Sequence, residues 1–100
     1  MTAQEFFASL PERADAAKTA GMHNTYVFDV EGAGQWTVAV DDGTVSVTEG
    51  AGAADCTIRA SEETLVKIAR GEANPTTAYM TGKLKIDGDM GAALKLQKLF

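Results

Sequence analysis

The hydrophobic pattern of the chain begins with helical signals. Thr2 and Glu5 stand at the capping-box spacing, in which a hydroxyl and a carboxylate each bind the other's backbone amide. Ser9 and Glu12 repeat that spacing. We therefore expect two short helices, with Pro11 in the first turn of the second, where its missing N–H costs little.

Strict alternation of apolar and polar residues replaces this pattern from Thr25 onward. It predicts three strands, because successive side chains of a strand point to opposite faces. The dipeptide Asp42-Gly43 supplies the positive φ angles of a tight hairpin, so we expect an antiparallel meander. The inward residues of the three strands are Tyr26, Phe28 and Val30, then Trp36, Val38 and Val40, then Val45 and Val47.

Two more strands and three more helices complete the predicted elements. The alternation returns at Cys56–Ala60 and at Lys83–Asp87, which predicts a fourth and a fifth strand. A helix is expected after Ser61, whose hydroxyl suits the N-cap position. Two others are predicted at Pro75–Thr81, with proline at the first helical position, and at Met90–Phe100.

The last of these helices is more apolar than packing on a sheet requires. On a wheel of 100° per residue its apolar side chains cover an arc about 220° wide, whereas a helix on a sheet needs a little over 100°. Gln97 is the one polar residue inside that arc. The surplus surface has three explanations that the pattern leaves open: another helix, a partner chain, or an apolar ligand held between helix and sheet.

Composition excludes several kinds of chemistry. The single cysteine, Cys56, cannot form an internal disulfide, and the single histidine, His23, leaves no His/Cys cluster for zinc or iron. We therefore expect no metal and no cofactor. No strand-turn-helix nucleophile motif accompanies any serine, and Cys56 occupies an inward strand position typical of an inert thiol, so we expect no enzymatic activity.

Charge narrows the set of partners. The net charge of −5 argues against nucleic acid, which requires a basic face. The distribution is uneven, because residues 1–55 carry nine acids and two bases, while residues 56–100 carry five acids and seven bases. This excess of bases is consistent with transient contact with an anionic membrane surface, and equally with solvated lysines. The lysines concerned are Lys83, Lys85, Lys95 and Lys98.

The closing part of the chain resembles a known family. The runs at 78–86, 88–90 and 95–97 are similar to the closing signature of sterol carrier protein type 2 domains, also called non-specific lipid-transfer domains. The likeness continues upstream through Asn74-Pro75, Ser61 and Trp36. It implies one domain over residues 1–100 with an α+β fold. In that fold a five-stranded, mainly antiparallel sheet has helices covering one face, which enclose an apolar tunnel for a fatty acid, acyl-CoA, phospholipid or sterol.

The resemblance and the apolar arc together lead to a functional hypothesis. We expect a non-catalytic carrier of a small apolar lipid, monomeric or weakly dimeric. The chain ends in Leu99-Phe100 without the basic-leucine end of peroxisomal relatives, and has no basic leader or apolar run of membrane length, so we expect a cytoplasmic protein. The alternative is an accessory interaction or dimerisation module for an enzyme of a lipid or quinone pathway. The expected ligand wall is Trp36, Val38, Leu65, Ile68, Met80, Leu84, Met90, Leu94, Gln97 and Phe100.

Overall fold

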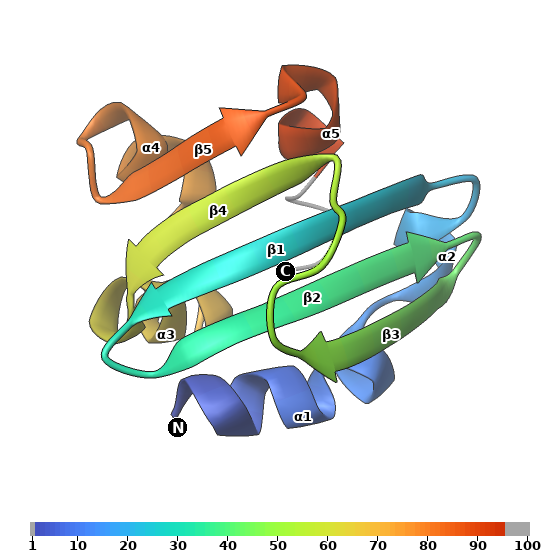
Figure 1. Ribbon diagram of the computed structural model, residues 1–100, viewed down its shortest axis with the longest axis horizontal. Coiled ribbons are helices and arrows are strands. Elements are labelled where there is room, and N and C mark those ends of the chain that lie inside the picture. The colour runs from blue at the N-terminus through green and yellow to red at the C-terminus, as the bar shows by residue number, and fades with distance from the viewer. Residues whose placement is uncertain (1, 96–100) are drawn as a thin grey trace.

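The computed structural model describes residues 2–95, which form one sheet and a set of short helices (Figure 1). No helix in this range is long and apolar enough to cross a membrane. In chain order the elements are α1 (Ala3–Arg13), α2 (Ala16–Thr19), β1 (His23–Glu31), β2 (Gly34–Asp41), β3 (Thr44–Glu49), β4 (Cys56–Ser61), α3 (Glu62–Ala69), α4 (Pro75–Met80), β5 (Leu84–Gly88) and α5 (Met90–Leu94).

The five strands lie in the order β3-β2-β1-β4-β5 and form a mixed sheet. Strands β1, β2 and β3 are the predicted antiparallel meander, and β5 pairs antiparallel with β4. Strand β4 pairs parallel with β1, placing Cys56 opposite Tyr26 and Ile58 opposite Phe28. The expected α+β fold with a five-stranded, mainly antiparallel sheet is therefore confirmed.

A parallel neighbour requires the chain to return along the sheet before β4 begins. The segment 50–55 makes this return across the face opposite the helices (Figure 1). It is held at both ends: Thr37 Oγ1 donates to the Gly50 carbonyl at 2.8 Å, and the Asp55 amide donates to the Thr25 carbonyl at 2.8 Å. The helices therefore share the other face of the sheet.

Aromatic side chains fill the core between α1 and the sheet. The Phe7 ring stacks on Trp36 with a centroid distance of 4.7 Å and lies 5.2 Å from the Phe28 ring. Such pairs add to the free energy gained by burying apolar area. Leu65 and Ile68 of α3 extend the same core toward β4.

The structure corrects the prediction of two N-terminal helices. The Thr2–Glu5 capping box is present, but α1 continues without a break from Ala3 to Arg13, with Pro11 inside it. Ser9 is not a cap, because its hydroxyl donates back to carbonyl groups of its own helix. The helix continues because Leu10, in its last turn, is buried in the same core as the phenylalanines. The separate helix α2 begins instead at an Asp15 cap.

The remaining predicted boundaries agree closely with the structure. Ser61 caps α3 and Asn74 caps α4, which ends one residue earlier than expected. The Asp42-Gly43 turn has φ angles of 45° and 87°, as a tight hairpin requires. The predicted helix from Met90 begins as expected and runs to Leu94, with Lys95 as its C-cap, and residues 96–100 of its predicted length lie outside the described residues.

Gly88 gives a test of how closely β5 is packed against the strand beside it. Its φ is +119°, and an added Cβ would lie 2.5 Å from the Asp55 carbonyl oxygen and 2.9 Å from the Cys56 Cα. We expect Gly88→Ala to lower the free energy of unfolding by at least about 3 kcal/mol in urea titrations. Gly71→Ala is the matched control, since its φ is +76° with nothing within 4 Å, and should cost only about 1 kcal/mol. Equal losses would contradict the close approach.

Candidate functional site: an apolar cleft beside the edge strand

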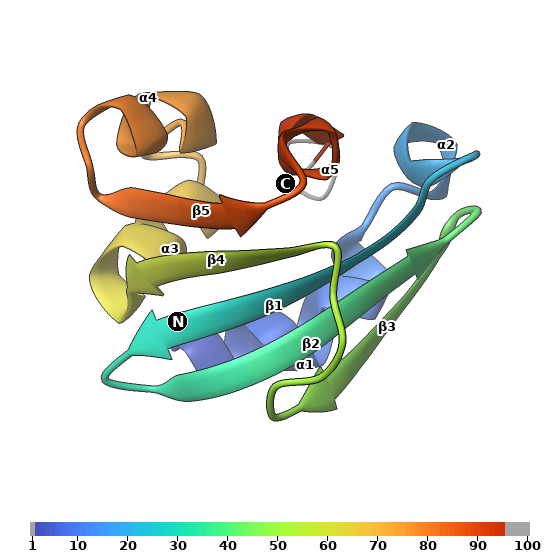
Figure 2. The same cartoon turned by 45° about the horizontal axis from the view of Figure 1, so that its top comes forward.

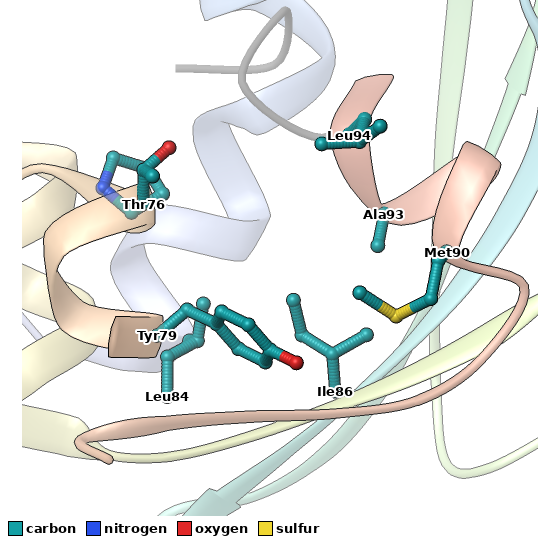
Figure 3. A pocket seen from close by; sticks show the side chains of 8 residues that line it. Thr76, Tyr79, Leu84, Ile86, Met90, Ala93 and Leu94 are labelled. Atoms are coloured by element: carbon teal, nitrogen blue, oxygen red, sulfur yellow. The ribbon is translucent and has the colours of Figure 1, made fainter. Parts of the chain in front are cut away.

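An apolar cleft of about 80 Å³ lies between α4, β5 and α5 (Figure 3). In Figure 3 the side chains of Tyr79, Ile86 and Met90 converge from the three elements toward the same space. Almost the whole lining is apolar, which suits a hydrocarbon rather than a charged ligand. The lining residues are Pro75, Thr76, Tyr79, Leu84, Ile86, Met90, Ala93 and Leu94.

The sequence places these side chains through simple local rules. Alternation along β5 turns Leu84 and Ile86 inward, where they pair with Ala60 and Ile58 of β4. The α4 helix begins at the Asn74 cap, whose carboxamide oxygen accepts the Thr76 amide at 2.8 Å. Strand β5 and helix α4 thus form two walls of the cleft, and hydrogen bonds of the backbone fix the position of both. The short helix α5 forms the third wall.

The wall formed by α5 is held by polar contacts at its first turn and at its middle. Its N-cap Asp89 accepts the Gly91 amide at 2.8 Å. The Tyr26 hydroxyl, rising from the buried centre of β1, donates to the Ala92 carbonyl at 2.6 Å. Burial, aided by the nearby Cys56, Asp55 and Asp89, raises the pKa of Tyr26 above its ordinary value, so the hydroxyl stays a donor. This bond anchors the helix over the sheet.

Cys56 and His23 do not line the cleft. Cys56 is a free, buried thiol, as predicted, and burial followed by Asp55 and Asp89 raises its pKa to about 11. A thiol with that pKa is protonated and unreactive at neutral pH. His23 lies exposed on β1, 2.8 Å from the Asp41 carboxylate. Among residues 2–95 no group of three or more histidine, cysteine or acidic side chains is placed to hold a metal.

The predicted ligand wall divides into three groups. Leu84, Met90 and Leu94 line the cleft together. Trp36, Val38, Leu65 and Ile68 are instead buried in the core, outside the cleft lining, and Met80 is an exposed residue of α4 that also lies outside it. Gln97 and Phe100 lie outside the described residues. A ligand-binding role for these ten residues stays a prediction.

Several lining residues were not predicted, although the sequence carries signals for most of them. Ile86 shares the inward face of β5 with Leu84, and Ala93 belongs to the apolar arc of the last helix. On α4, Pro75 and Tyr79 are four residues apart and so share a face, which Met80 does not. The correct face of α4 could be chosen only once its position beside β5 was known.

The fold and the cleft together define a class of small α+β domains in which an apolar cleft lies between a mixed sheet and its covering helices. The chain belongs to the SCP-2 sterol transfer family, whose family model matches residues 3–100. This is a family of lipid-binding and lipid-transfer domains, which are typically non-catalytic. The resemblance seen in the closing part of the sequence is confirmed.

Relatives of known name are much longer proteins. Sterol carrier protein 2 of Bos taurus is 46% identical over 65 residues, which cover 64% of this chain and 12% of that protein. Hydroxysteroid dehydrogenase-like protein 2 of Xenopus tropicalis is 35% identical over 100 residues, covering 96% of this chain and 24% of that protein. The chain thus spans a quarter or less of the length of these curated relatives.

Solved structures show the same architecture. The stereoselective inverting sec-alkylsulfatase Pisa1 from Pseudomonas sp. matches 99% of this chain with 16% of its own, at 27% identity and a TM-score of 0.84. Palmitated SCP2L2 from Aedes aegypti matches 99% of this chain with 94% of its own, at 20% identity and a TM-score of 0.79. The second likeness shows a shared fold.

The anchoring role of Tyr26 is open to a direct test. Tyr26→Phe removes the donor and leaves the Ala92 carbonyl without its partner, so we expect a loss of about 1 to 3 kcal/mol in the free energy of unfolding. Amide exchange in Ala92–Lys95 should rise more than exchange in α3. Tyr79→Phe, which removes a hydroxyl from the surface side of the cleft, is the matched control and should change neither measurement. Unchanged exchange in Tyr26→Phe would contradict the anchor.

The raised pKa of Cys56 predicts that the protein loses stability at alkaline pH. The unfolded thiol ionises near its ordinary pKa of 9.0 and the folded one near 11, so the unfolded state loses its proton first as pH rises. The contribution of Cys56 to stability is therefore complete below about pH 9 and is lost between about pH 9 and 11. Urea titrations from pH 8 to 10 should show this slope in the wild type and a shallower one in Cys56→Ala. Identical slopes would exclude the effect.

Proposed function

We propose that this chain is a non-catalytic carrier that binds one apolar lipid in the cleft between α4, α5 and β5. The observation that carries the proposal is the apolar lining, to which β5 and both helices contribute. Membership of a lipid-binding and lipid-transfer family supports it. The proposed carrier acts as one domain over residues 1–100, in the cytoplasm, as a monomer or weak homodimer.

A long hydrocarbon chain is the cargo that this lining suits. Each buried methylene contributes about 0.8 kcal/mol, so a chain of about 15 contributes about 12 kcal/mol before the costs of association. That leaves micromolar affinity or better. A cleft of about 80 Å³ is small for such a chain, so binding requires α5 to move away from β5. Within residues 2–95 α5 spans Met90–Leu94, and its movement would break the hydrogen bond from the Tyr26 hydroxyl to the Ala92 carbonyl.

The polar end of the cargo has two candidate partners in the lining. The Thr76 and Tyr79 hydroxyls both come from α4, and in Figure 3 the Tyr79 ring reaches from that helix toward Ile86. Both hydroxyls are neutral, so they would form hydrogen bonds to a carboxyl, ester or hydroxyl group of the lipid, whether or not that group is charged. The cargo classes consistent with this arrangement are fatty acid, acyl-CoA, phospholipid and sterol. Palmitate is the probe of choice, because the Aedes aegypti protein of the same fold is palmitated.

An interaction module for a lipid or quinone pathway enzyme is the alternative. The same fold occurs in a protein described as "UbiJ-SCP2 Ubiquinone synthesis protein", which matches 96% of this chain at 22% identity and a TM-score of 0.65. The observation that favours this alternative is the exposed apolar surface of α4 and α5. A stable complex or dimer that covers this surface, with no uptake of lipid, would support the module over the carrier.

Ala93 allows the cleft to be blocked without disturbing the sheet. Its side chain points from α5 into the cleft (Figure 3), so Ala93→Phe fills the space that the acyl chain needs. We expect the affinity for palmitate, measured by isothermal titration calorimetry, to fall more than about tenfold, and the free energy of unfolding to fall by about 1 to 3 kcal/mol because Ala93 is itself buried. Ala17→Phe, on the exposed surface of α2, adds the same ring elsewhere and should bind as the wild type does.

Two outcomes would contradict the carrier. Wild-type protein purified from cells and examined by native mass spectrometry should carry bound lipid or take up palmitate. If the purified protein carries no lipid and binds no palmitate at micromolar concentration, the carrier proposal is wrong. Equal affinity in wild type and Ala93→Phe would place the lipid elsewhere in the fold.

A further inference from the structure

The sheet has a second edge, strand β3, which differs from the edge formed by β5. On the face away from the helices β5 carries Lys85 and Asp87, and charged residues on an edge strand disfavour pairing with another strand. On the same face β3 carries only uncharged side chains, which are Thr44, Ser46 and Thr48. Among residues 2–95 no segment pairs with the outer side of β3, which lies at the margin of the sheet in Figure 2. Strand β3 is therefore an open edge.

The hydrogen-bond pattern shows which backbone groups of β3 point to this open edge. Opposed residues of an antiparallel pair alternate between those that exchange both backbone hydrogen bonds and those that exchange none. The Gly50 amide donates to the Gln35 carbonyl at 2.8 Å, so every second residue of β3 back from Gly50 is bonded to β2. The residues between them are Val45, Val47 and Glu49. Their amide and carbonyl groups point away from β2 and are available to another strand.

A notch of about 260 Å³ lies beside the open edge, on the helix side of the sheet. Ala8 and Pro11 of α1 line one side of it, while Val47 of β3 and the buried Trp36 line the other. Figure 1 shows α1 running antiparallel to β3 along this margin of the sheet. A strand added beside β3 would therefore direct every second side chain toward the notch.

An open edge strand beside a groove is the arrangement in which a domain binds an extended peptide by strand addition. The backbone of the edge strand supplies hydrogen bonds that any sequence can form, so they provide affinity. The groove receives alternate side chains of the peptide and so provides specificity. Strand β3 and the notch offer both parts of such a site.

The charges around the notch favour a basic partner. Glu49 ends β3, and Glu12 lies four residues after Ala8 and so shares its face of α1. Both glutamates are exposed, and neither takes part in an ion pair within residues 2–95. Because α1 and β3 are antiparallel, the two carboxylates lie toward opposite ends of the notch. Arg13 of α1 points instead toward α3, where its guanidinium donates to the Ala69 carbonyl at 3.4 Å.

The same charges argue against a second copy of this chain as the partner. In an antiparallel pair of two β3 strands, Glu49 of each copy would lie toward the Glu12 end of the other. Like charges placed opposite one another destabilise strand pairing. A segment with positive charges at its ends meets both glutamates favourably.

We propose that β3 and the notch bind an extended, basic segment of another protein, which adds antiparallel to β3 as a further strand of the sheet. Apolar side chains of valine size at alternate positions occupy the notch, and lysine or arginine at the two ends lies near Glu49 and Glu12. Strand β3 has six residues and is roughly 20 Å long, so a segment of about seven residues spans it. This edge is opposite to the cleft edge, so peptide binding is independent of lipid binding.

Amide exchange measured by NMR tests the strand addition. The probe is a synthetic peptide with blocked ends, in which valine and threonine alternate between two terminal lysines. Binding should slow the exchange of the Val45 and Val47 amides at least about tenfold, because these amides gain partners. The Ser46 and Thr48 amides are already bonded to β2 and should change little. The same peptide methylated on its valine amide nitrogens keeps its side chains and should bind at least about tenfold more weakly.

Two pairs of variants test the notch and its charges by titration calorimetry. Ala8→Trp fills the notch and should lower the affinity for the peptide at least about tenfold, whereas Ala17→Trp, on the exposed surface of α2, should bind as the wild type does. Glu49→Lys should weaken binding of the lysine-ended peptide and strengthen binding of a glutamate-ended one. Glu72→Lys makes the same change at an exposed position outside the notch and should alter neither affinity. All four variants should bind palmitate as the wild type does.

Four results would overturn the peptide site. The first is no change in the β3 amide signals at about 1 mM of the lysine-ended peptide. The second is equal affinity for the plain and the methylated peptide. The third is equal affinity of Ala8→Trp and Ala17→Trp for the plain peptide. The fourth is a stable wild-type dimer that Ala8→Trp dissociates, because a second copy of the chain would then occupy the edge.

Discussion

The parallel pairing of β1 with β4 is the constraint on which the rest of this structure depends. At its start, Asp55 binds two segments of the chain that lie far apart in the sequence. Its amide and carboxylate bind the carbonyl and amide of Thr25, and its carbonyl accepts the Asp89 amide at 2.9 Å. One residue therefore fixes the register of β4 against β1 and the point where β5 leads into α5. Gly88 can pass so near only because it lacks a side chain.

The position of the cleft follows from this arrangement. With β4 beside β1, strand β5 becomes the edge of the sheet, and among residues 2–95 the inward side chains of Leu84 and Ile86 are flanked by the short helices α4 and α5. The opposite half of the sheet is covered by the longer α1, whose Phe7 ring stacks on Trp36. A dense core and a cleft thus occur on the same face. The two halves of the sheet differ because the helices that cover them differ in length and in the size of their inward side chains.

Most local structure was predictable because it depends on neighbouring residues. Alternation identified the strands, and hydroxyl and carboxamide caps identified the starts of α3 and α4. Pro11 was misinterpreted because its local effect is to interrupt a helix, whereas the burial of Leu10 keeps α1 continuous. For the candidate site, the inward face of β5 and the apolar arc of the last helix were predicted. The facing surface of α4 was not, since Tyr79 and Met80 are equally apolar neighbours.

What the sequence by itself determined is the set of elements, their inward faces, the absence of paired cysteines and, through its closing signature, the family. These follow from spacings of a few residues or from matched runs of residues. Only the tertiary structure decided which apolar residues are core and which line the cleft. Trp36 and Leu84 are both inward strand residues, yet the Trp36 ring stacks on Phe7 whereas Leu84 lines the cleft. That difference arises from the packing of segments far apart in the chain, which no local pattern records.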